Sequence, residues 1–134
     1  MKIEGLRQFK RYRIKLPIEL QSIDAIPGHS QLPPLRFKTK TRDISLGGLQ
    51  IDLVNHLEDL DPNWQTSWFR DRYFWIHLMG ISTIPEGLFS KAKVVHLEEK
   101  DNTRPEGVGM EFQDLHRGIL DKLKQFLNNL TTSS

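Results

Sequence analysis

The sequence contains no cysteine, which excludes both disulfide bonds and thiolate metal sites. It also has no apolar run approaching the roughly 20 residues that cross a bilayer as a helix. Its first five residues, Met-Lys-Ile-Glu-Gly, carry charge at once and so lack the apolar core of a signal peptide. We therefore expect a soluble protein of the cytoplasm with no membrane span.

Signatures of catalysis are missing too. The sequence has no Gly-x-Ser-x-Gly run, no Walker loop and no dinucleotide fingerprint. Its five histidines are scattered, with no pair at metal-ligand spacing: they are His29, His56, His77, His96 and His116. We predict that the protein is not an enzyme and holds neither a metal nor a cofactor.

What is present suits one small globular domain: 134 residues, 37% of them hydrophobic and 27% charged. The net charge is only +2, but the cations gather at the start of the chain. Six of them lie within the first 15 residues: Lys2, Arg7, Lys10, Arg11, Arg13 and Lys15. Such an imbalance indicates an anionic partner at the N-terminal side. For the charges alone, a solvated basic arm that aids solubility is the default interpretation.

Two short motifs sharpen this expectation. Arg7 and Arg11 form an R-x-x-x-R, and Asp43, Ser45 and Gly48 form a D-x-S-x-x-G. Guanidinium forks hold phosphates and the Hoogsteen edge of guanine by paired hydrogen bonds. A carboxylate and a hydroxyl add polar contacts, and glycine lets a ligand approach the backbone. The two motifs together predict a site for a small anionic guanine nucleotide.

Alternation of apolar and polar residues predicts strands over residues 12–23, 35–44, from 49 onward, 73–79, 88–97 and 107–112. Pro17 lacks a backbone donor, so we expect it at an edge or a bulge. In the second strand one face should carry Leu35, Phe37, Thr39 and Thr41, and the other a row of four cations: Arg36, Lys38, Lys40 and Arg42. Such a row is more often a solvated face than an anion site.

Residues 55–72 contain a turn or a short helix, and we expect Trp64, Trp68 and Phe69 to form an aromatic cluster over one barrel end. An exposed aromatic pair there would instead contact a partner protein. From about residue 114 to 130 the period changes to 3.6, which predicts a helix with Asp114 as its N-cap. Its apolar stripe consists of Leu115, Ile119, Leu120, Leu123, Phe126, Leu127 and Leu130. The fold class is therefore mainly β: six antiparallel strands in a closed or nearly closed barrel with one C-terminal helix.

With these elements in order, the chain resembles the PilZ domain, a bacterial receptor module for the second messenger cyclic di-GMP. The R-x-x-x-R followed by the strand around Tyr12, the D-x-S-x-x-G turn, and the closing strand and helix all look like those of the family. The resemblance implies a PilZ-type barrel over residues 12–130 and a flexible arm over residues 1–11. It also implies that the arm folds over the ligand.

Site roles follow from the same resemblance. Arg7 and Arg11 would grip the phosphates and the guanines, Asp43 would accept from guanine N–H groups, and Ser45 would hydrogen-bond near the ligand. Gly47 and Gly48 would leave room for the ligand. Secondary contacts would come from Lys10, Arg13 and Arg42.

These roles make the protein a cyclic di-GMP receptor whose closed arm changes a surface read by a separate protein partner. Two alternatives remain open. One is a PilZ-like adaptor that binds proteins without nucleotide, and the other, less favoured, is a barrel that binds nucleic acid through its basic residues.

Overall fold

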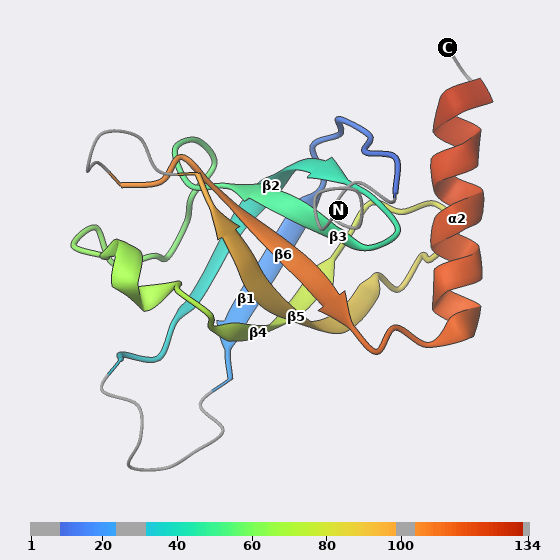
Figure 1. Ribbon diagram of the computed structural model, residues 1–134. Helices are drawn as coiled ribbons and strands as arrows, with labels where there is room; N and C mark the ends of the chain where they lie inside the picture. Colours follow the sequence, from blue (N-terminus) through green and yellow to red (C-terminus); the bar gives the residue numbers. More distant parts are fainter. Residues whose placement is uncertain (1–8, 24–31, 99–103, 133–134) are drawn as a thin grey trace, which may run out of the picture.

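The computed structural model of the protein describes residues 9–23, 32–98 and 104–132. Six strands close into an antiparallel barrel with the order β1-β2-β3-β6-β5-β4 (Figure 1). The elements are β1 (Pro17–Ser22), β2 (Arg36–Ile44), β3 (Gly48–Asp52), η1 (Thr66–Trp68), β4 (Tyr73–Leu78), β5 (Leu88–Leu97), β6 (Gly107–Gln113) and α2 (Arg117–Thr132). The predicted barrel with a C-terminal helix is thus confirmed.

The barrel interior is filled by the residues that alternation assigned to it. Phe37, Phe74 and Ile51 are at most 1% exposed, and the buried core continues without a break from β1 to the last turns of α2. On β2 the inner face includes Phe37, Thr39 and Thr41, as predicted, and the four cations lie on the outer side. None of the helices in the described part of the chain is long and apolar enough to cross a membrane.

The first strand begins later than its alternation predicts, at Pro17 and not near residue 12. The reason lies in Thr41 on β2, whose hydroxyl accepts from the Leu16 N–H at 2.9 Å and donates to the Ile14 carbonyl at 2.7 Å. The Thr41 hydroxyl therefore takes over part of the backbone pairing just before Pro17, while the Thr41 N–H still donates to the Leu16 carbonyl at 2.9 Å. Pro17 itself is the first residue of a strand paired on both sides, so the prediction of an edge or a bulge was wrong.

A bulge interrupts β2 close to its end. Thr41 pairs with Ile51, but Asp43 pairs with Gln50, so Arg42 is an extra residue in the ladder. Strict alternation would have placed Asp43 on the same inner face as Thr41. The inserted Arg42 shifts the register by one residue, which leaves Asp43 half-buried outside the core and puts Ile44 fully inside.

Different elements close the two ends of the barrel. Figure 1 shows α2 against the end where β2 leads into β3, and the η1 segment at the opposite end. The apolar stripe of α2 packs as predicted, with Leu123, Phe126 and Leu127 buried. The prediction of Asp114 as N-cap was wrong. Asp114 has a positive φ of 56°, and the ring Nδ1 of His116, just before the helix, accepts from the Gly118 N–H at 3.0 Å.

Aromatic packing at the η1 end confirms the predicted cluster. Trp64 meets Phe69 edge-on with ring centroids 5.4 Å apart, and Phe69 stacks on Phe74 at 6.0 Å. Trp64 and Phe69 are 5% and 0% exposed, and Trp68 is partly buried against the same core. These residues belong to the core and leave no aromatic pair free for a partner at this end.

Candidate functional site

The turn between β2 and β3 is held by hydrogen bonds of Ser45. Its backbone N–H donates to the Gly48 carbonyl at 2.8 Å, and its hydroxyl donates to the same carbonyl at 3.3 Å. The hydroxyl also accepts from the Gly47 N–H at 3.2 Å. Ser45 therefore shapes the turn itself, a role that a small hydroxyl residue fills by bonding to its own backbone.

The N-terminal segment reaches this turn through a short bridge. Tyr12 and Ile44 exchange two backbone hydrogen bonds, of 2.8 and 2.9 Å. Just before the bridge the Phe9 ring lies over Gly47, where an added Cβ would be 2.7 Å from it. The Lys10 ammonium lies 5.1 Å from the centre of the Tyr12 ring. Residues 9–12 thus run alongside the D-x-S-x-x-G turn.

The charges of three arginines act on the carboxylate of Asp43. Burial raises the pKa of Asp43 above its ordinary value and the charge of Glu98 adds to this rise, while the charges of Arg11, Arg42 and Arg13 oppose it. Burial and the Glu98 charge together therefore outweigh the attraction of the carboxylate to the cations. The neighbouring cations thus do not fully offset the combined cost of burial and of the Glu98 charge to the charged Asp43 carboxylate. This carboxylate is therefore suited to a ligand that brings its own N–H donors.

The two glycines of the turn have different surroundings. A Cβ on Gly48 would overlap the carbonyl oxygen of Met110, because β3 and β6 approach closely there. The absence of a side chain at Gly48 is thus a requirement of the barrel. Gly47 faces only the Phe9 ring, which belongs to a side chain able to move.

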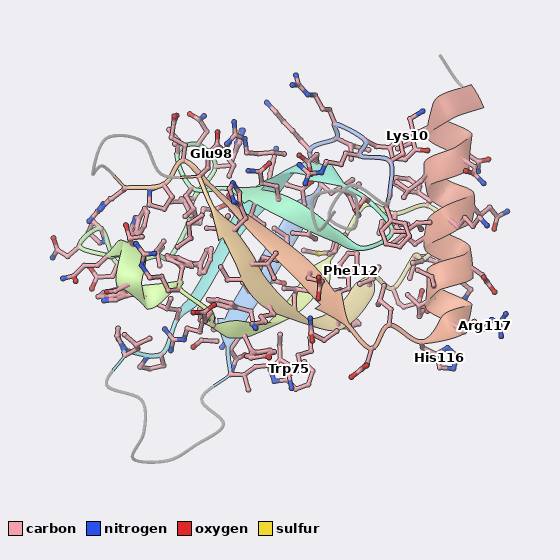
Figure 2. All side chains as sticks on the ribbon, in the orientation of Figure 1. Lys10, Trp75, Glu98, Phe112, His116 and Arg117 are labelled. Carbon is pink, nitrogen blue, oxygen red and sulfur yellow. The ribbon has the colours of Figure 1, made fainter. Side chains whose placement is uncertain are left out.

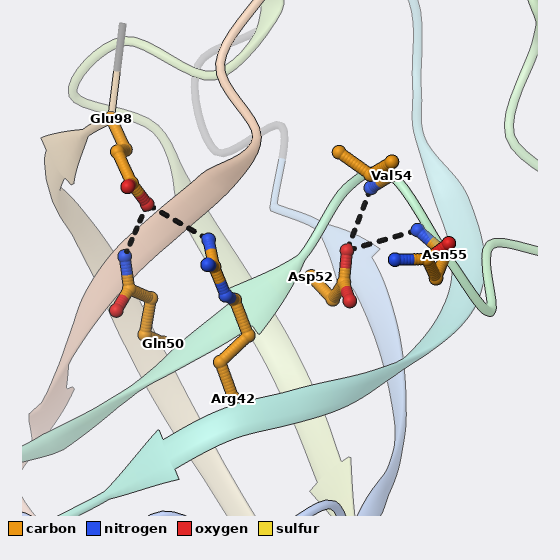
Figure 3. Close-up of polar contacts among 6 residues, drawn as sticks. All are labelled: Arg42, Gln50, Asp52, Val54, Asn55 and Glu98. Atoms are coloured by element: carbon orange, nitrogen blue, oxygen red, sulfur yellow. Dashed lines mark hydrogen bonds and ion pairs between the residues drawn. The ribbon is translucent and has the colours of Figure 1, made fainter.

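A polar network joins the bulge to the far end of β5 (Figure 3). The Arg42 Nη1 donates to Glu98 Oε2 at 2.8 Å, and Gln50 Nε2 donates to the same oxygen at 3.2 Å. Gly107 lies beneath, with all three side chains within 3.2 Å of where its Cβ would be. This network engages Arg42, which was predicted as a secondary ligand contact.

Next to it, Asp52 stabilises the chain as it leaves β3. Its carboxylate accepts from the backbone N–H groups of Val54 and Asn55 at 2.7 and 3.0 Å. Burial alone would raise the pKa of Asp52, but the hydrogen bonds from Asn55 and Val54 outweigh it and hold the pKa below its ordinary value. The protein thus stabilises the charged form of the Asp52 carboxylate, whereas it raises the pKa of Asp43.

The structure brings most of the predicted residues to one place. Five of them lie in or beside the turn, namely Arg11, Asp43, Ser45, Gly47 and Gly48, with Lys10, Arg13 and Arg42 next to them. Arg7 lies outside the described residues. Sequence reasoning missed Gln50 and Glu98, since neither belongs to a motif and only barrel closure sets Glu98 beside Arg42. Among the residues that the structure describes, no group of three acidic or histidine side chains could hold a metal.

Comparison with known proteins gives the same fold. The family model for the PilZ domain matches residues 5–129 of this chain. No curated protein matches the chain.

Three solved structures share the fold at low sequence identity. The PilZ domain of YcgR from Escherichia coli, solved with c-di-GMP, has a TM-score of 0.59 at 17% identity, over 95% of this chain and 92% of that one. The PilZ domain of CeSA from a cellulose-synthesizing bacterium has a TM-score of 0.55 at 13% identity, over 91% and 98%. The Bacillus subtilis inhibitor of motility (MotI/DgrA) has a TM-score of 0.63 at 15% identity. The match covers 96% of this chain but only 52% of the inhibitor, so this chain spans about half its length.

Proposed function

Because this chain belongs to the PilZ domain family, we propose that it is a cytoplasmic receptor for cyclic di-GMP and acts by binding, without catalysis. The ligand would lie against the 43–48 turn under the N-terminal arm. The observation that carries this proposal is that the Tyr12–Ile44 bridge sets the arm beside the turn, where the charges of Arg11, Arg13 and Arg42 act on the half-buried carboxylate of Asp43. The YcgR domain with the same fold was solved with c-di-GMP, which supports the choice of ligand.

The chemistry of the residues suits each part of that ligand. Arg11 and Arg7 present planar, permanently charged forks to the two phosphates and stack on guanine rings. Asp43 accepts the N–H groups on the Watson–Crick edge of one guanine. Two phosphates, an arginine pair and one carboxylate come close to charge balance, which limits the cost of desolvating the site.

The N-terminal arm is the moving part in this proposal. Tyr12 is bridged to Ile44, so residues preceding it need only a short swing to cover the turn. Phe9 lies on Gly47, and the ligand would displace it. Closure of the arm then changes the surface around the turn, and a separate protein partner reads that change.

Isothermal titration calorimetry with cyclic di-GMP tests the site. We expect the parent to bind and Arg11→Ala and Asp43→Ala to lose about 1.5–3 kcal/mol each, the cost of one charge-assisted contact. Arg36→Ala is the matched control, because Arg36 is an exposed arginine at the other end of the same strand. It should bind like the parent.

Each failure has its own meaning. A parent that does not bind cyclic di-GMP removes the function, and the protein-only adaptor then becomes the leading alternative. Unchanged affinity in both Arg11→Ala and Asp43→Ala removes the site while leaving the function. Equal losses in the Arg36 control would show that general positive charge, and not this site, drives binding.

Salt dependence separates a dinucleotide receptor from a nucleic-acid barrel. A protein that contacts many phosphates loses affinity steeply with salt, whereas a ligand with two phosphates gives a shallow slope. A steep slope with single-stranded DNA, together with tighter binding than to cyclic di-GMP, would favour the nucleic-acid reading.

Limited proteolysis tests closure of the arm. Cleavage after Lys10 should slow when cyclic di-GMP is added, because a closed arm is inaccessible to the protease. An unaltered cleavage rate at saturating ligand would contradict the clamp.

A further inference from the structure

A second surface lies away from the turn, on the outer face of β1, β2, β4 and β5. It contains a groove of about 530 Å³ whose lining includes Arg36, Trp75, His77 and Phe89. We call it the aromatic groove, and we include Lys91, which pairs with Trp75 across β4 and β5. In Figure 2 Trp75 lies on the opposite side of the barrel from Lys10, so this groove is separate from the candidate nucleotide site.

Large apolar side chains are exposed in this groove, where they do not contribute to the barrel core. Trp75 is 55% exposed and Phe89 is 65% exposed, although both lie within regular strands, Trp75 in β4 and Phe89 near the start of β5. Phe89 stacks flat on His77, with ring centroids 3.9 Å apart and an angle of 10°. The His77 ring is held by Glu86, since its Nε2 lies 3.1 Å from that carbonyl oxygen. The aromatic surface is therefore pre-organised, which reduces the entropy lost on binding.

Strand register places cations on both sides of the aromatic centre. One row across four strands reads Arg36, Gln21, Trp75 and Lys91. Among the described residues no carboxylate lies within ion-pair distance of Arg36 or Lys91. The neighbouring row contains Glu19, but that carboxylate lies 3.9 Å from Lys38 and 3.8 Å from His77. The row through Trp75 therefore has a cation at each end that no carboxylate of the described residues pairs, and the Lys91 ammonium lies 5.0 Å from the centre of the Tyr73 ring.

We propose that the aromatic groove docks an extended segment of a protein partner in which an apolar side chain lies between two carboxylates. Arg36 and Lys91 are three strand spacings apart, about 14 Å. An extended chain rises about 3.3 Å per residue, so the two carboxylates should be about four positions apart. Aromatic and arginine side chains in a concave site are typical of the residues that carry most of the energy at protein interfaces.

Charge and shape argue against the other occupants. A second copy docked symmetrically on this face would set Arg36 and Lys91 against the same cations. A flat bilayer could not reach the floor of the groove, because the segment around Asp59 lines it and Glu58 is bridged to Lys38. A polynucleotide carries a phosphate on every nucleotide, so it would set negative charge against Glu19 and Asp59 as well as against the cations, whereas the proposed segment has carboxylates only at Arg36 and Lys91.

Selection from a phage-displayed library of random linear peptides on the full chain tests this proposal. We expect enriched peptides to carry an apolar residue between acidic residues about four positions apart. A synthetic peptide of the leading sequence should bind the parent and lose affinity about tenfold or more with Trp75→Ala and with Lys91→Glu. Val95→Ala is the matched control, because Val95 is an apolar residue on β5 that is 51% exposed and lies outside the groove. It should bind like the parent.

Several results would overturn the proposal. They are a selection with no enrichment, enrichment of basic peptides, and unchanged affinity in Trp75→Ala with its native circular dichroism spectrum retained. Binding of a thymidine oligonucleotide, binding of vesicles containing phosphatidylglycerol, or self-association by sedimentation, if abolished by Trp75→Ala, would assign another occupant. The proposal does not rest on nucleotide binding, so peptide affinity should persist without cyclic di-GMP and in Asp43→Ala.

Discussion

Two sides of the barrel's outer surface, the 43–48 turn and the aromatic groove, differ in what determines their geometry. Around the 43–48 turn, a bulge, two glycines and a short backbone bridge assemble polar groups, and burial together with the Glu98 charge raises the pKa of Asp43 more than its arginines lower it. On the aromatic groove, unbroken register simply lines up exposed side chains along four strands. The first side depends on irregular backbone for its geometry, and the second depends only on which residue types face outward. Mutations should therefore affect stability strongly on the first side and weakly on the second.

Among variants on the two sides of the outer surface, the largest effect should come from Gly48→Ala. Its Cβ would overlap the Met110 carbonyl, which is backbone and cannot move aside. We expect a loss of about 3 kcal/mol in the free energy of unfolding, measured by urea denaturation. Gly47→Ala is the matched control, since only the movable Phe9 ring faces it, and it should lose less than about 1 kcal/mol. Equal losses in the two variants would contradict the distinction drawn between these glycines.

The next largest loss in the free energy of unfolding should come from Thr41→Val. The substitution preserves the shape of a buried side chain, 1% exposed, but removes its two hydrogen bonds to Leu16 and Ile14. Leaving a buried N–H and a carbonyl without that partner should cost about 2 kcal/mol of unfolding free energy. Amide hydrogen exchange at Leu16 should become faster as well. Unchanged exchange there would show that Thr41 does not hold the segment before β1.

Asp43→Asn, in contrast, should increase the free energy of unfolding. Because the folded state raises the pKa of Asp43, the folded protein binds its proton more readily than the unfolded chain does. The charged carboxylate therefore destabilises the fold above that pKa, and stability of the parent rises as the pH falls through this window. At neutral pH the variant should gain at most about 1 kcal/mol, because the half-exposed carboxylate is screened by solvent.

Thermal unfolding of Asp43→Asn and parent across acidic and neutral pH checks this sign. The gain should vanish below the ordinary pKa of an aspartate, where both side chains are neutral. A variant less stable than the parent at neutral pH would mean that the arginines stabilise the carboxylate more than burial penalises it. Loss of cyclic di-GMP binding together with a gain in stability would mark Asp43 as a residue retained for binding.

The smallest effect should be that of Trp75→Ala on the other side of the barrel. We expect its unfolding free energy to stay within about 0.5 kcal/mol of the parent, because the side chain is more than half exposed. Its neighbour Phe74 faces the core at 0% exposure, and Phe74→Ala should cost about 3–5 kcal/mol. Chemical denaturation of the pair gives the comparison. A large loss in Trp75→Ala would mean that the exposed ring supports the fold and is not available to a partner.

The barrel was predictable from the sequence because its signals are local. Alternation assigned Ile18, Phe37, Ile51 and Phe74 to the inside, and all four are buried. The α2 stripe followed from its period in the same way. One error arose where a distant group decides the outcome, because the hydroxyl of Thr41 takes over part of the pairing before Pro17. The other error was local, because His116, and not Asp114, caps the Gly118 N–H of α2.

The candidate site was predictable only as a list of residues. Motif spacing pointed to Arg11, Asp43 and Ser45, but it could not place the arm against the turn, which depends on the Tyr12–Ile44 bridge. It also could not place Glu98 beside Arg42, 56 positions away. The aromatic groove had no signal in the sequence, because Trp75 and Phe89 look like ordinary strand residues until the strands are paired.

The sequence by itself determined which segments are strands, which faces are apolar and which residue types are available for a guanine nucleotide, because a two-residue or 3.6-residue period is a property of the local backbone. Tertiary structure alone decided where Asp43 lies, what surrounds its charge and which cations flank Trp75. The physical reason is that a closed barrel brings together residues from remote strands, and the bulge at Arg42 shifts the register only in relation to β3.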